Sequence, residues 1–265
     1  MSAVPTHRRT RGLLTIVVSL LVFVPLLVLG AAIGWPGSLG DPAEVALPRL
    51  LDHESATRLG YLAYLTYSVA FFPVAVSISM WRRETSANLT CALGIAIGAA
   101  AVSALARGIG ITRWLSAAFP LAERWQHSTS EATREALAVQ FETLDDFAGA
   151  IGETLGVSIF AAVWLGATIA GPGLPRWARI TGALTLVALA APAIELAGVD
   201  AEASVSLSST AITIWLFAVG VAMMRDRTDG NISPSPAGSP RSVPMSSPDS
   251  DPGDKVGPRS RPQTL

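Results

Sequence analysis

Charged residues are scarce in this sequence. Asp, Glu, Lys and Arg together make up 15% of the 265 residues, whereas soluble domains average about 25%. Hydrophobic residues make up 50% and lie in long runs, which excludes an ordinary soluble domain and indicates an integral membrane protein. The formal net charge of −1 gives no sign of a nucleic-acid partner.

Residues that bind metals or carry out catalysis are also few. Cys91 is the only cysteine, so an internal disulfide is excluded. The three histidines, His7, His53 and His127, lack metal-ligand spacing, and no cofactor is expected. The metalloprotease, nucleophile-elbow and phosphate-loop motifs are missing, so no catalytic residue is proposed and the sequence favours a protein that is not an enzyme.

Six apolar runs are long enough to cross a membrane as helices, since a bilayer core about 30 Å thick takes about 20 helical residues. The predicted fold class is all-α: a polytopic membrane helix bundle with six transmembrane helices and an amphipathic outer helical segment. The membrane domain is placed at 13–227. The predicted spans are 13–33, 59–81, 89–106, 147–170, 177–199 and 205–224.

The flanking segments differ from the spans in composition. The basic arm 1–12 before an apolar run is typical of a signal peptide or of a first membrane helix, and a run of about 21 residues favours an uncleaved helix. Pro25 should kink this helix. Segment 35–58 is interpreted as a polar connection. The tail 228–265 is rich in Pro, Ser, Gly and Asp, and it is predicted to be disordered.

The distribution of arginine predicts the orientation. Arginines gather in the N-terminal arm, in the connections after the second and fourth spans, and after the sixth span, whereas the connection between the fifth and sixth spans has none. By the positive-inside rule, both termini should lie in the cytoplasm of a protein of the cell membrane.

The connection 107–146 is predicted to be a helical lid at the outer face. Trp114 and Trp125 are too apolar for a solvated loop, and Ser128 precedes Glu131 at the spacing of a capping box. An apolar stripe follows at helical spacing, made of Leu137, Phe141, Leu144 and Ala148. The segment is either an amphipathic lid over the mouth of the bundle or an extension of the fourth span beyond the membrane.

Glycines recur four residues apart in two of the predicted spans. Gly94 and Gly98 form such a pair in the third span, and Gly152 and Gly156 form one in the fourth. This spacing lets helix backbones approach closely, so we expect both pairs to make helix contacts within the chain.

A group of polar side chains is expected in the outer third of the bundle. Glu153 lies about 9 Å below the outer start of its helix, and the predicted topology places Arg107, Glu195, Tyr61 and Tyr64 at a similar depth. Ionisable groups within a span usually face a partner or a wet cavity. We therefore expect Arg107 to pair with Glu153 or Glu195.

Two functions are compatible with this polar group. The first is a non-enzymatic membrane protein that binds a lipid, a small ligand or a partner protein at its outer face. The second is an intramembrane enzyme or proton-coupled carrier that uses Glu153 and Glu195. Membrane lipids are the only partners that the sequence predicts.

The fourth and fifth spans resemble those of an uncharacterised bacterial family of six-span membrane proteins of unknown function. The resemblance rests on Glu153, on Trp-Leu-Gly at 164–166 and on the turn at 171–177, which contains Leu-Pro-Arg-Trp. Ala178 and Arg179 stand where that family usually has Leu-Gly. The resemblance implies the six-span fold and a membrane location, and it implies no activity.

Overall fold

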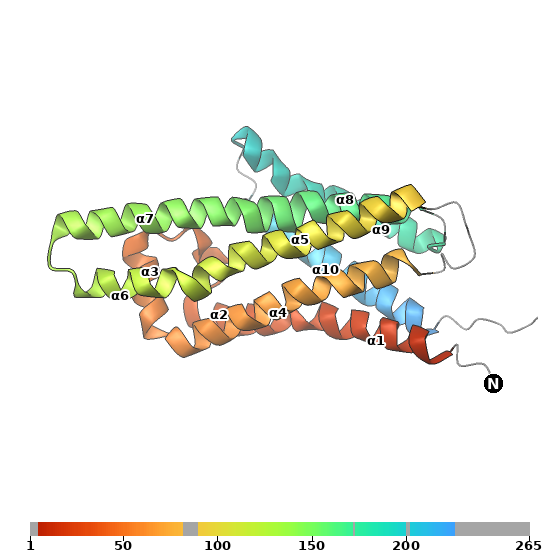
Figure 1. Cartoon of the computed structure of the whole chain (residues 1–265), viewed down its shortest axis with the longest axis horizontal. Coiled ribbons are helices and arrows are strands. Elements are labelled where there is room, and N and C mark those ends of the chain that lie inside the picture. The colour runs from red at the N-terminus through yellow and green to blue at the C-terminus, as the bar shows by residue number, and fades with distance from the viewer. Residues whose placement is uncertain (1–4, 82–89, 172, 200–201, 226–265) are drawn as a thin grey trace, which may run out of the picture. The chain divides into compact units, whose positions relative to one another are not determined.

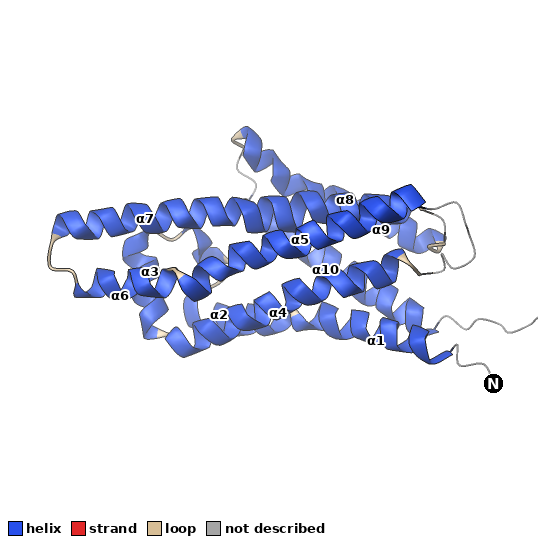
Figure 2. Ribbon diagram, in the orientation of Figure 1, coloured by secondary structure: helices blue, strands red, loops and turns tan. Residues whose placement is uncertain are grey.

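The computed structural model describes residues 5–81, 90–171, 173–199 and 202–225. Within these ranges all regular structure is helical (Figure 2). Six helical stretches in the described part of the chain are long and apolar enough to cross a membrane. The predicted all-α, six-span fold is therefore confirmed, and the protein is a multi-pass membrane protein.

The chain alternates in direction from one span to the next (Figure 1). The first half consists of α1 (Pro5–Leu21), α2 (Phe23–Ile33), the 3₁₀ turn η1 (Gly37–Gly40), α3 (Ala43–Asp52), α4 (Glu54–Ser79) and α5 (Thr90–Ser116). The second half consists of α6 (Ala118–His127), α7 (Glu131–Gly149), the π-helix η3 (Ala150–Phe160), α8 (Ala161–Ala170), α9 (Arg176–Ala190), the 3₁₀-helix η4 (Ala191–Ala197) and α10 (Glu202–Arg225).

Pro25 interrupts the first span, as predicted. A proline has no N–H to donate to the carbonyl four residues earlier, and α1 ends at that residue, Leu21, with Val22 between the two helices. After the break, the two parts pack against different partners, α1 along α10 and α2 along α4.

Helices α3, α6 and α7 pack together at one end of the bundle, which we call the lid end (Figure 1). Segment 35–58, interpreted above as a polar connection, instead contains α3, whose apolar residues Ala43, Leu47 and Leu50 are buried. These residues recur at i, i+4 and i+7, a helical pattern that could have revealed α3.

The chain between the third and fourth spans is helical almost throughout. Helix α5 continues past the predicted limit at 106 to Ser116, and α7, η3 and α8 form one stretch of 40 residues. The predicted capping box at Ser128 is wrong: α7 begins after Ser130, and no side chain caps it. Leu137 and Phe141 of the predicted stripe are buried. The lid role of 107–146 stays a proposal.

Only one of the predicted glycine pairs makes helix contacts. Gly152 and Gly156 lie against α5, whereas a Cβ atom placed on Gly94 or Gly98 would meet no heavy atom within 4 Å. The predicted disordered tail at 228–265 lies outside the described residues.

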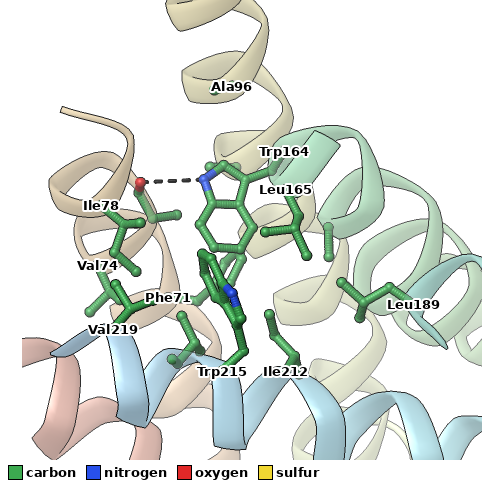
Figure 3. Packing of buried hydrophobic residues seen from close by; sticks show 14 of the residues in the cluster. Phe71, Val74, Ile78, Ala96, Trp164, Leu165, Leu189, Ile212, Trp215 and Val219 are labelled. Atoms are coloured by element: carbon green, nitrogen blue, oxygen red, sulfur yellow. Dashed lines mark hydrogen bonds between the residues drawn. The ribbon is translucent and has the colours of Figure 1, made fainter. Parts of the chain in front are cut away.

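An aromatic core holds the spans together on the side away from the lid end. The indole of Trp164 is completely buried and lies edge-on to Phe71 and Trp215 (Figure 3). It donates a 3.0 Å hydrogen bond to Ser79 Oγ. Trp215 in turn donates a hydrogen bond to the carbonyl of Ala178. Because each indole N–H has an acceptor, these residues join α4, α8, α9 and α10 without leaving a buried donor unpaired.

Candidate functional site

A cavity of about 370 Å³ lies between α2, α4, α5, η3 and α10. Apolar and aromatic side chains supply most of its wall. The aromatic lining residues are Phe23, Trp35, Tyr61, Tyr64, Tyr67 and Trp114. The volume and the apolar wall are typical of small-molecule sites, which occupy about 300–1,000 Å³.

The aromatic residues support one another at the lid end. The rings of Tyr61 and Trp114 are stacked with centroids 5.1 Å apart, and Phe141 of α7 lies edge-on to Trp114 at 6.0 Å. Tyr64 contacts Trp35 at a centroid distance of 5.5 Å. The wall of the cavity thus includes residues from the loop after α2, and α7 backs it from behind.

Arg113 forms the main ion-pair group beside the cavity. Its Nε lies 3.0 Å from Asp145 Oδ1, and its Nη2 donates a 3.4 Å hydrogen bond to Glu153 Oε1. The Nε–H does not point at Asp145, so this contact is an ion pair without a hydrogen bond. Trp114 lies under the guanidinium at 5.2 Å. One arginine therefore links α5 to both α7 and η3.

Glycines let α5 and η3 approach closely enough for these contacts. A Cβ atom on Gly110 would lie 2.7 Å from the Cα atom of Gly152, and one on Gly149 would lie 3.1 Å from Arg113 Nη1. Ser103 also donates a 2.6 Å hydrogen bond to the carbonyl of Gly156. A π-helix, with its i to i+5 hydrogen bonds, is rare and is frequently found at functional sites.

Arg107 has a different environment from Arg113, although both lie on α5. Its side chain is 4% exposed, and its guanidinium carbon lies 4.3 Å from the ring centroid of Phe71. Its Nε and Nη2 atoms have no hydrogen-bond partner among the described residues. The side chain lines the cavity, so it presents unpaired donors beside an apolar chamber.

The structure brings together four of the five residues predicted for the outer polar group. Arg107, Glu153, Tyr61 and Tyr64 all line this cavity. Glu195 lies in η4, but its side chain is outside the described residues. Among the ion pairs of the described side chains, Glu153 is bound by Arg113 and not by Arg107, so the expected Arg107–Glu153 pair is wrong. Pairing of Arg107 with Glu195 stays a prediction.

Arg113 and Asp145 were missed because the predicted third span ended at 106. A signal for the longer helix was present, since the apolar residues Ala100, Ala104, Ile111 and Trp114 follow one another at i, i+4, i+11 and i+14. The structure buries this whole face of α5. Extending that stripe places Arg113 next to it within the bundle.

The polar residues of the site do not form a metal-binding cluster. Within the described ranges, no three His, Cys, Asp or Glu side chains gather closely enough to hold a metal ion. The arrangement instead offers a shaped apolar volume, hydrogen-bond donors from arginine and tyrosine, and a carboxylate that is already engaged.

Comparison with known proteins identifies the family. A family described as a domain of unknown function (DUF4386) matches residues 10–224, and the chain belongs to this family. The resemblance seen in the fourth and fifth spans is thereby confirmed, and the match extends across all six spans. No curated protein and no solved structure matches the chain.

Proposed function

We propose that this DUF4386 protein is a non-enzymatic membrane protein that binds a small, mainly apolar molecule in the cavity. The observation that carries the proposal is a chamber of about 370 Å³ with an aromatic wall and a few polar groups. Of the three ligand classes compatible with the sequence, a lipid or small ligand fits such a chamber better than a partner protein does.

The orientation belongs to the same proposal. The arginine distribution favours cytoplasmic termini, and α1 begins and α10 ends at the side of the bundle opposite the lid end (Figure 1). The lid end would then face the outside of the cell membrane.

The alternative, an intramembrane enzyme or proton-coupled carrier, has less support from the geometry. Its proposed carboxylate, Glu153, is held by the guanidinium of Arg113, which favours a structural role. Glu153→Gln separates the two functions, because loss of abundance indicates structure, whereas loss of activity at normal abundance indicates chemistry.

A substitution that fills the cavity tests the proposal. Val157 of η3 lines the cavity, and Val157→Phe should occupy part of its volume. The matched control is Val163→Phe on α8, where the side chain is 43% exposed and is not among the cavity-lining residues. Each protein would be extracted in mild non-ionic detergent and its bound small molecules measured by native mass spectrometry.

We expect the wild-type protein and Val163→Phe to carry similar amounts of a small molecule, and Val157→Phe to carry less than half as much. Equal amounts in all three proteins would contradict binding in this cavity. A wild-type protein that carries nothing, and that takes up no added lipid, would contradict the function itself.

A further inference from the structure

Arg107 is a permanently charged side chain whose donors lack acceptors. Arginine cannot lose its charge in a protein, and a buried donor without an acceptor is costly. Its Nε and Nη2 are buried and unpaired among the described residues, and the ring of Phe71 covers one face of the guanidinium. The described surroundings therefore stack against this arginine without supplying it with hydrogen-bond acceptors.

A second unpaired donor lines the same cavity. The hydroxyl of Tyr61 is buried and has no hydrogen-bond partner in the described part of the structure. Nearby carboxylates do not meet this need, since Asp145 and Glu153 are both engaged by Arg113. The unpaired donors of Arg107 suit a carboxylate or phosphate oxygen, because arginine bonds most strongly to ionised acceptors.

The cavity also has a side that faces the lipid. Phe23 and Leu26 of α2 and Ile214 of α10 line it, yet they are 44%, 39% and 64% exposed. This follows from the break before Pro25, after which α2 packs along α4 while α10 stays along α1. In a membrane, exposed apolar side chains on spanning helices contact acyl chains, so this side of the cavity opens towards lipid.

From these two features we infer that the ligand is a single-chain anionic amphiphile from the bilayer. Its carboxylate or phosphate headgroup is bound by Arg107, and its chain lies towards the opening between α2 and α10. This inference rests on the proposed function and adds the charge and the route of entry of the ligand.

The test compares ligands that share a chain and differ in charge. The purified protein in neutral detergent is titrated with a long-chain fatty acid and its fatty alcohol, and with a lysophosphatidic acid and its monoacylglycerol. Inorganic phosphate and acetate are tested as competitors. Arg107→Gln is compared with Arg107→Lys and with the control Arg58→Gln, whose side chain is 40% exposed and pairs with Glu54 on its own helix.

We expect the wild-type protein to bind at least one anionic amphiphile ten-fold or more tightly than its neutral counterpart. The stronger of the two anionic ligands identifies the headgroup as carboxylate or phosphate. Arg107→Gln should abolish the preference, Arg107→Lys should restore part of it, and Arg58→Gln should leave it intact. Phosphate and acetate should compete weakly, because they lack the chain.

Equal affinity for charged and neutral ligands in the wild-type protein would overturn the inference, even if Arg107→Gln failed to fold, and would leave the proposed function standing. The inference would also be overturned if inorganic phosphate or acetate displaced the bound amphiphile as effectively as unlabelled amphiphile does, because the site would then bind free anions. A Glu195→Gln protein that gained the anion preference, when the wild type had none, would show that Glu195 is the partner of Arg107. Binding of none of these amphiphiles would contradict the proposed function instead.

Discussion

The two buried arginines of α5 show how the surroundings of a side chain decide its role. Arg113 meets two carboxylates and fixes three helical segments, whereas Arg107 meets a ring and a cavity. The first arrangement satisfies the charge within the chain, and the second leaves donors available for a ligand. Two residues of the same type, six positions apart, therefore call for different tests.

Removing a carboxylate from Arg113 should destabilise the protein. Breaking a buried ion pair typically costs about 3–5 kcal/mol, and we expect Asp145→Asn to fall at the lower end because Asp145 is 17% exposed and Glu153 remains. The midpoint of thermal unfolding in detergent should fall by several degrees. The control is Asp146→Asn at the exposed neighbouring position, and equal losses in both variants would argue against the pair.

Loss of the Tyr61 hydroxyl, unlike loss of the Asp145 carboxylate, should not destabilise the protein. The group is buried without a partner, so Tyr61→Phe removes an unsatisfied donor and keeps the ring that stacks on Trp114. We expect the ligand-free protein to unfold at the same or a slightly higher temperature. A clear loss of stability without ligand would mean that the hydroxyl has a structural partner.

The contact of α5 with η3 depends on the absence of side chains. Gly110 and Gly152 meet backbone to backbone, and backbone atoms cannot move aside as the end of a side chain can. The position of Arg107 and Arg113 relative to Glu153 follows from this contact. Small residues at a helix interface thus set the geometry of the polar group.

Adding a methyl group should have opposite effects on stability at Gly110 and at Gly98, which both lie on α5. In Gly110→Ala the new Cβ would lie 2.7 Å from Gly152 Cα and 3.0 Å from the Ala148 carbonyl oxygen, so we expect overpacking that costs about 1–3 kcal/mol. Gly98→Ala on the same helix meets nothing within 4 Å and should stabilise it by up to about 1 kcal/mol. Thermal unfolding of both variants compares them, and similar shifts would contradict the close contact.

At the scale of the whole molecule, the start of α1 and the end of α10 lie on the side of the six spans opposite the lid end (Figure 1). The cavity lies towards the lid end, since Trp35, Leu39 and Trp114 line it. Orientation in the membrane therefore decides from which side water-soluble molecules could reach the polar group.

Reporter fusions test that orientation. We expect an enzyme that works only outside the cytoplasm to be active when fused at residue 130, between α6 and α7, and inactive at residue 240. The prediction follows from the arginine distribution. Activity at 240 and none at 130 would invert the topology, and the lid end would then face the cytoplasm.

The spans could be predicted from sequence because a membrane imposes a length of apolar helix on each of them. The interior arrangement could not, because the direction of a side chain depends on which helix faces it. Arg107 and Glu153 line the same cavity, yet the ion-pair partner of Glu153 is Arg113. The pairing of Arg113 with Glu153 depends on the close contact between Gly110 and Gly152. Glycine spacing also predicted a helix contact at Gly98, where the structure shows none.

The distribution of tryptophan gives the cavity an optical consequence. Of the seven tryptophans in the chain, Trp35 and Trp114 line the cavity, whereas Trp164 and Trp215 lie in the aromatic core. An acyl chain that carries bromine quenches indole fluorescence on contact. A bound brominated amphiphile would therefore quench the fluorescence of Trp35 and Trp114 and leave that of Trp164 and Trp215 unchanged. Moving the bromine along the chain would then report which end of the ligand lies deepest.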